Sequence, residues 1–158
     1  MLRDFSSEGL RSFLESAGVN VRFFRFASHT MTVDDAARQI NVGREKIIKS
    51  LLFICDNGSS VLAIVPGDRR VDERKLAAFY GVKRVRWATA LEVKDLTGYD
   101  VGAVPPVGHK NRIKTIIDER VFRFERVIGG GGEINTLMEI SPEDIKRLNE
   151  AQVGDISK

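Results

Sequence analysis

Lys49 is the residue whose type and position most strongly suggest chemistry. It interrupts Ile47-Ile48-Lys49-Ser50-Leu51-Leu52-Phe53, a segment otherwise patterned for burial. A lysine in such a segment either extends its ammonium outward to solvent or projects it into a lined cavity. The periodicity favours the outward arrangement. The inward one would make Lys49 a binding group for an anion such as a phosphate.

The stretch from Gly98 to Gly108 is the second candidate. Gly102 and Gly108 allow the main chain to approach a ligand closely, whereas Pro105 and Pro106 stiffen the path. A stiff loop with free backbone N–H and C=O groups can hold a small polar group. An ordinary connection between elements is the alternative interpretation.

The remaining reactive side chains give little support to metal or nucleophilic chemistry. Neither His29 nor His109 has a partner at ligand spacing, and the single cysteine, Cys55, permits no internal disulfide and no cysteine-built zinc site. Cys55 is typical of a small packed side chain. The run 129–132 is four glycines without the Lys-Ser/Thr ending of a phosphate loop, so it is a flexible connection or a pocket-lining loop. We therefore expect no metal and no cofactor.

Five helices and seven strands are expected around these residues. Helices are predicted after caps at Ser6 or Ser7, Thr32, Thr89 and Ser141, and one more helix is predicted from Asp72 to about Phe79. The strands are predicted at 21–26, 47–54, 61–65, 83–87, 115–117, 121–125 and 134–140. Because hairpins outnumber regular βαβ units, the pattern indicates an α+β fold with a mixed sheet.

Length and composition bound the class of protein. The chain has 158 residues, of which 42% are hydrophobic and 30% charged, which is typical of one folded domain spanning 1–158 and excludes a wholly disordered chain. No run of 18 apolar residues exists, so no transmembrane span is expected. The first residues do not resemble a signal peptide. These features and the lone cysteine indicate a cytoplasmic protein without a membrane partner.

Charge is distributed unevenly along the chain. The formal net charge is only +3, but 44–86 contains ten Lys or Arg against five Asp or Glu. A small basic cluster follows at 109–114, and from residue 133 onward six acids face three bases. Such an asymmetry can guide a phosphate-bearing partner to one face, although a solvated mixed-charge surface would show the same pattern.

Taken together, several segments resemble the YbaK and prolyl-tRNA synthetase editing-domain family of aminoacyl-tRNA deacylases. The matching segments are the helix after Thr32, IIKSLLF, VLAIVPGDRRVDERKLAAFYG, LTGYDVGAVPPVG, TIIDERVF, the glycine run and EISPEDI. They cover about three-quarters of the chain, in order. The resemblance implies a largely antiparallel, barrel-like sheet with surrounding helices, and a free-standing hydrolase of mischarged tRNA, with a small amino acid on tRNA for proline as the expected substrate.

The resemblance also implies roles for individual residues. The lysine on which editing depends in the family corresponds to Lys49, with Ser50 where threonine is common. The family's glycine–proline loop corresponds to Gly102-Ala103-Val104-Pro105-Pro106, and Pro105 stands where relatives usually have a serine. The family's small-residue turn starts at Gly131, and polar pocket residues of alanine-specific relatives correspond to Asn135 and Thr136. Cysteine-specific relatives tend to carry an arginine pair where this chain has Glu133-Ile134.

The hypothesis that follows is a metal-free hydrolysis. Lys49 would contact the phosphate or ribose of the terminal adenosine, the Gly102–Pro105 backbone would hold the amino acid, and a tRNA hydroxyl would accept the proton. The expected partners are aminoacyl-tRNA and a synthetase, not DNA. The basic residues expected to carry the acceptor stem are Arg69, Arg70, Arg74, Lys75, Lys110, Arg112 and Lys114. The alternatives are a non-catalytic module that binds tRNA or a synthetase, and a nucleotide-binding protein indifferent to aminoacylation.

Overall fold

The computed structural model describes residues 3–30 and 32–158. The elements in chain order are α1 (Ser7–Ser16), β1 (Arg22–Arg25), α2 (Val33–Ile40), the 3-10 turn η1 (Arg44–Lys46), β2 (Ile48–Cys55), β3 (Ser60–Pro66), α3 (Glu73–Tyr80), β4 (Val85–Trp87), α4 (Ala90–Thr97), β5 (Lys114–Asp118), the 3-10 helix η2 (Glu119–Arg123), β6 (Val127–Gly130), β7 (Thr136–Ile140), α5 (Pro142–Asn149) and β8 (Gln152–Gly154). In this part of the chain, no helix has both the length and the apolar character to cross a membrane.

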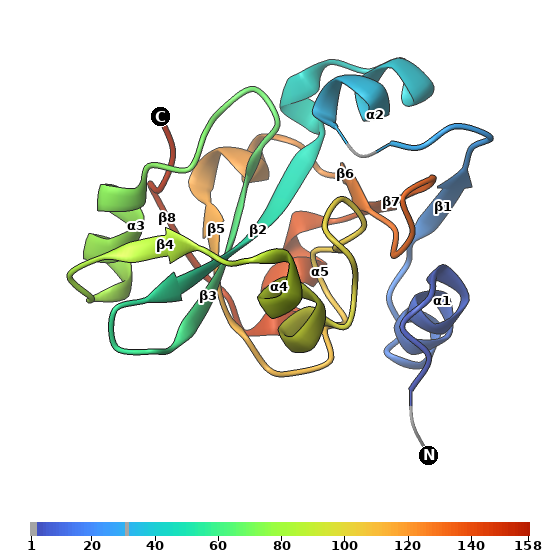
Figure 1. The fold of residues 1–158 in the computed structure, drawn as a ribbon. Helices are drawn as coiled ribbons and strands as arrows, with labels where there is room; N and C mark the ends of the chain where they lie inside the picture. Colours follow the sequence, from blue (N-terminus) through green and yellow to red (C-terminus); the bar gives the residue numbers. More distant parts are fainter. Residues whose placement is uncertain (1–2, 31) are drawn as a thin grey trace.

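The strands form two sheets rather than one barrel-like sheet. The smaller sheet has the order β1-β7-β6 and the larger has β4-β2-β3-β5-β8. All pairs are antiparallel except β3 with β5 and β5 with β8. The mixed, largely antiparallel α+β fold is therefore confirmed. Among the described residues the sheets do not close into a barrel, and Figure 1 shows the smaller one to the right of the larger.

Local capping explains where the helices begin. The side chains of Ser6, Thr32, Asp72, Thr89 and Ser141 each accept a hydrogen bond from a backbone N–H in the first turn of the helix that follows. Such a cap satisfies one of the N–H groups that the helix leaves unpaired at its start. All five helix starts agree with the sequence prediction.

One predicted strand is absent, and two observed strands were not predicted. The segment 121–125 is not a strand, because Asp118 accepts a hydrogen bond from the backbone of Arg120 and turns the chain into η2. Strand β6, which ends with the first two residues of the glycine run and pairs with β7, was not predicted. The short strand β8 was not predicted at all.

The feature of the fold that matters most for function is a gap beside β2. Strand β4 pairs with β2 only at Phe53, Ile54 and Cys55. At the other end of β2, the smaller sheet touches it through an isolated parallel bridge between Ile47 and Ile128. Between these two contacts the edge of β2 opposite β3 has no neighbouring strand among the described residues.

Two buried layers hold this edge in place. One face of the larger sheet packs on the main core with α1, α4 and α5, and the other packs on Leu76 of α3 and Ile156 near the C-terminus. A third cluster joins Ala36 of α2 to Ile47, Ile128 and Leu137. The gap in the sheet is therefore bounded by well-packed elements on both sides.

Candidate functional site

A cavity of about 440 Å³ occupies the gap beside β2. Its floor is β2 from Ile48 to Leu52, and its walls come from the start of α2, the glycines of β6, the β4–α4 junction and the loop after α4. The volume falls within the range of roughly 300–1,000 Å³ that is usual for small-ligand sites. Most of the lining is aliphatic, so the few polar groups stand out.

Ser50 supplies the most distinctive polar groups in the cavity. Its hydroxyl oxygen is buried and has no hydrogen-bond partner. The carbonyl of Leu52 points away from β3, since it accepts from the N–H of Ala88 at 3.0 Å. Because backbone groups two residues apart point to the same edge of a strand, the N–H and C=O of Ser50 also face the gap. A donor, an acceptor and a free hydroxyl thus meet at one residue.

Lys49 lines the cavity but directs its ammonium to the cavity's edge. The ammonium donates a hydrogen bond to the carbonyl of Arg69, which lies in the loop after β3 and is not a lining residue. Burial lowers the pKa of Lys49, and the nearby charges of Arg44 and Arg70 lower that pKa further. The side chain is only partly buried. Its long stem leaves the ammonium able to reach an anion at the mouth of the cavity.

The loop from Val101 to Val104 forms the wall opposite β2 and lies against β6. The carbonyl of Ala103 accepts from the N–H of Gly132 at 3.0 Å. A Cβ on Gly130 would lie only 2.4 Å from the carbonyl oxygen of Val104. The glycine at 130 therefore permits a contact between strand and loop that a side chain would prevent.

The second half of this loop is anchored away from the cavity. The carbonyl of Gly108 accepts from the Arg3 guanidinium at 2.6 Å, and this guanidinium lies over the rings of Phe5 and Phe13. Nε2 of His109 lies 2.7 Å from the carbonyl of Pro105. Burial lowers the pKa of His109 to about 4, so the ring is neutral at pH 7 and donates this hydrogen bond from Nε2. The anchors fix the loop from behind.

The predicted substrate-binding residues are only partly brought together. Lys49, Ser50, Gly102 and Val104 line the cavity. Ala103 and Asn135 instead line a second, more open cavity of about 540 Å³. The others line neither cavity. Pro105 and Gly108 are buried in the anchored part of the loop, Gly131 follows β6, and Thr136 begins β7 and accepts a hydrogen bond from the N–H of Gly131.

Sequence reasoning missed several residues that line the main cavity. Thr30 and Ala36 enclose its α2 end, and Trp87 and Val101 flank its other end. Trp87 ends the short basic strand β4, and an aromatic residue next to arginines was the available signal. Thr30 and Ala36 gave no signal for a site, because contacts distant in sequence place them there: Thr30 donates to the carbonyl of Ile134, and Ala36 packs with Ile128 of β6.

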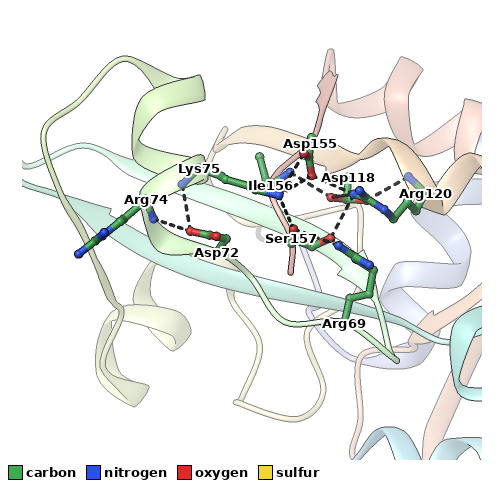
Figure 2. Close-up of polar contacts among 9 residues, drawn as sticks. All are labelled: Arg69, Asp72, Arg74, Lys75, Asp118, Arg120, Asp155, Ile156 and Ser157. Carbon is green, nitrogen blue, oxygen red and sulfur yellow. Dashed lines mark hydrogen bonds and ion pairs between the residues drawn. The ribbon is translucent and has the colours of Figure 1, made fainter.

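The predicted RNA-binding residues fall into two groups. Arg69 and Lys75 are engaged within the protein: Arg69 donates to Ser157, and Lys75 forms an ion pair with Asp155 at 3.0 Å. Arg112 forms an exposed ion pair with Glu150. The side chains of Arg70, Arg74, Lys110 and Lys114 are exposed. Figure 2 shows Lys75 directed into the polar cluster around Asp155, whereas Arg74 extends away from it.

Comparison with known proteins gives consistent matches. Residues 27–148 match the family model described as "Aminoacyl-tRNA editing domain". The chain is 25% identical, over 85% of its length and 82% of the relative, to a protein of Enterococcus faecalis named "Putative Cys-tRNA(Pro)/Cys-tRNA(Cys) deacylase EbsC". It is 33% identical, over 68% of its length, to a Lactobacillus helveticus proline–tRNA ligase, of which it spans 19%.

A solved structure extends the likeness to the whole chain. It is described as a "putative trans-editing enzyme for prolyl tRNA synthetase", and it shares 30% sequence identity with this chain and a TM-score of 0.88. The match covers 100% of this chain and 99% of the other. The relatives thus include a separate protein of similar length and one much longer synthetase.

Proposed function

The chain belongs to the aminoacyl-tRNA editing domain family, and on that premise we propose that it is a free-standing hydrolase of mischarged aminoacyl-tRNA, acting in the cytoplasm on a small amino acid esterified to tRNA for proline. The observation that carries the proposal is the cavity at the open edge of β2, with Lys49 at its rim and the polar groups of Ser50 inside. The names of the relatives support the substrate class.

The open strand edge suits the chemistry of ester hydrolysis. Water adds to the ester carbonyl, negative charge develops on its oxygen, and the ribose oxygen of the tRNA leaves with a proton. In the proposed mechanism the N–H of Ser50 donates to that oxygen, as fixed backbone donors do in acyl-transfer enzymes. The Ser50 carbonyl or hydroxyl binds the substrate's ammonium. A neighbouring tRNA hydroxyl accepts the proton from water and passes its own proton to the leaving ribose oxygen.

Lys49 contributes charge at the entrance in this mechanism. Its ammonium leaves the carbonyl of Arg69 and contacts the phosphate or ribose of the terminal nucleoside, so that the ester is held over β2. The lowered pKa of Lys49 agrees with a partly desolvated cation beside Arg44 and Arg70, two positive charges that an incoming phosphate would offset.

Size selection follows from the walls. A synthetase pocket cannot strongly reject an amino acid smaller than its own, because a methylene contributes only about 1–3 kcal/mol, and a second hydrolytic site then removes the product. The aliphatic walls contributed by Val33, Ala36 and Val104 would admit a small side chain into the cavity.

The test is single-turnover deacylation of a panel of mischarged tRNAs, with alanyl- and cysteinyl-tRNA for proline as the first members. We expect the wild type to hydrolyse at least one of them, and Lys49→Ala to lower the rate about 100-fold or more. Lys46→Ala is the matched control, because Lys46 lies three residues away and does not line the cavity.

A result without turnover would identify a different function. Saturable tRNA binding with no hydrolysis of any panel member would favour a non-catalytic binding module, the alternative suggested by Pro105 in place of the usual serine. Pro105 is buried outside both cavities, which argues that this replacement alters the loop more than the cavity surface. Full activity in Lys49→Ala would overturn the role of that residue.

A further inference from the structure

Trp87 has an environment that the proposed hydrolysis does not explain. It is the only tryptophan of the chain, it ends β4, and it lines the outer end of the main cavity. The residue is 53% exposed, although a tryptophan ordinarily loses most of its surface on folding. Val101, on the loop opposite, also lines this end and is 52% exposed. At this end, the rim of the cavity is therefore apolar and exposed.

The indole ring is held in place from within the protein. Phe53 on β2 is fully buried, and its ring centroid lies 4.6 Å from that of Trp87 with the planes at 43°. The two residues are also cross-strand neighbours in the β2–β4 pair. A buried partner on one side and solvent on the other leave a supported aromatic surface available to a ligand.

Basic residues precede Trp87 in the chain, and one of them is paired with an acid. Lys83, Arg84 and Arg86 are exposed just before it in the chain. Arg86 makes two hydrogen bonds to Glu92, at 2.8 and 2.9 Å, and a third to the carbonyl of Trp87 at 3.2 Å. An aromatic surface beside cations is the combination that binds single-stranded nucleic acid through stacking and phosphate contacts.

We propose that Trp87 stacks on the base of the 3′-terminal nucleoside of the tRNA, and that it is a positioning contact for the substrate rather than a catalytic residue. The inference rests on the proposed function, because the ester to be hydrolysed is attached to the ribose of that nucleoside. With the aminoacyl group inside the cavity, the attached base must lie within one nucleoside length of the opening. Trp87 is the aromatic side chain that lines the cavity there.

The lone tryptophan makes the contact directly measurable. An RNA hairpin that ends in CCA and carries no amino acid is titrated into the wild type. Because the chain also has two tyrosines, the fluorescence is excited where tyrosine does not absorb, so that it reports on Trp87. We expect saturable quenching, and no quenching by a hairpin whose last nucleoside lacks its base. Equal quenching by the two hairpins would overturn the proposal.

A double-mutant cycle supplies the second measurement. Trp87→Ala should weaken binding of the CCA hairpin roughly 5- to 150-fold and leave binding of the abasic hairpin unchanged. Trp87→Phe should recover most of the lost affinity for the CCA hairpin. In deacylation the loss should appear as a higher half-saturating RNA concentration with little change in the maximal rate. Leu91→Ala is the control, because Leu91 is 71% exposed and does not line the cavity.

The outcomes separate the two proposals. Melting curves establish that each variant is folded, and Trp87→Phe keeps an aromatic ring on Phe53 if Trp87→Ala does not fold. Base-dependent quenching without turnover would leave the stacking contact standing and refute the hydrolase. Normal deacylation by Trp87→Ala at limiting RNA would refute the stacking contact and leave the hydrolase standing.

Discussion

At the scale of single residues, the site concentrates its polarity in the backbone and in one hydroxyl. Ser50 presents an unpartnered hydroxyl and two backbone groups at the open edge of β2. Lys49, one residue earlier, contributes its ammonium from the rim. His109, in the loop after α4, does not line the cavity and instead donates a hydrogen bond to the carbonyl of Pro105.

His109 should make the stability of the protein sensitive to acid. Its pKa is about 4 in the folded chain, below the ordinary value of 6.5, because burial disfavours the charged ring. Between pH 6.5 and pH 4 the unfolded chain therefore binds a proton that the folded chain does not. The free energy of unfolding should fall as the pH is lowered through this window, and this contribution should be constant above and below it.

The measurement is the melting temperature from pH 7.5 to pH 3.5 for the wild type and His109→Gln, which keeps a side-chain N–H donor but cannot titrate. We expect the wild type to lose more of its melting temperature between pH 6.5 and pH 4 than the variant does. Parallel curves for the two proteins would show that His109 does not titrate as described.

At the scale of elements, the cavity depends on a strand of small residues lying against a loop. Gly129 packs against Ile48, and Gly130 lies against the carbonyl of Val104. Larger residues in β6 would push β2 and the loop apart, and the cavity between them would change shape. The first two glycines of the run are thus required by close packing rather than by flexibility.

Gly130→Ala should lower deacylation more strongly than a surface glycine substitution does. The new Cβ would meet the Val104 carbonyl at 2.4 Å, so either the loop or β6 must shift, at a cost of roughly 1–3 kcal/mol in stability. Gly43→Ala is the matched control, because its Cβ would meet only the end of the Glu45 side chain, which can move away. Single-turnover rates and melting temperatures measure both effects. Equal effects of the two substitutions would contradict this role for Gly130.

The elements also show which features could be predicted from the sequence. Capping residues such as Thr89 act on the turn immediately after them, so local pattern predicted every helix start. Strand β6 escaped prediction because glycines carry no side-chain periodicity and pair here through β7, which follows later in the chain. Lys49 and Gly102 were predicted as site residues from the sequence pattern as well as from the resemblance, and Ser50 from the resemblance alone. Trp87 was not, because its place at the cavity depends on contacts distant in sequence.

At the scale of the whole molecule, the C-terminal segment is joined to the same loop that holds Lys49. Arg70 and Lys158 exchange backbone hydrogen bonds of 2.9 and 2.8 Å, and Arg69 donates to Ser157. Asp118 is fully buried and accepts from the N–H of Ile156, as Figure 2 shows. The carbonyl of Arg69 in turn accepts from Lys49. The position of the ammonium therefore depends on packing at the end of the chain.

Substitutions of two adjacent cations, Arg74 and Lys75, should affect tRNA binding and stability separately. Arg74→Ala should weaken tRNA binding and reduce the slope of log affinity against log salt by about 1, with little change in melting temperature, because Arg74 is exposed and directed away from the protein's own carboxylates. Lys75→Ala should lower the melting temperature and leave the slope unchanged, because Lys75 is paired with Asp155. Salt-dependent binding and thermal melting test both. The reverse pattern would place the RNA on a different face.

The open edge of β2 has a consequence for how specificity can change by mutation. The donor and acceptor that Ser50 turns toward the gap belong to the main chain, so every amino acid except proline would keep the N–H, and no side-chain substitution can delete the carbonyl. An alanine scan would therefore leave these backbone groups intact and would detect only the side chains that form the cavity walls. Replacing the amide nitrogen of residue 50 by an ester oxygen would remove the donor and leave every side chain in place. We therefore expect the hydrolytic activity to be retained when side chains are substituted, while residues such as Val33 and Ala36 determine which amino acid is accepted.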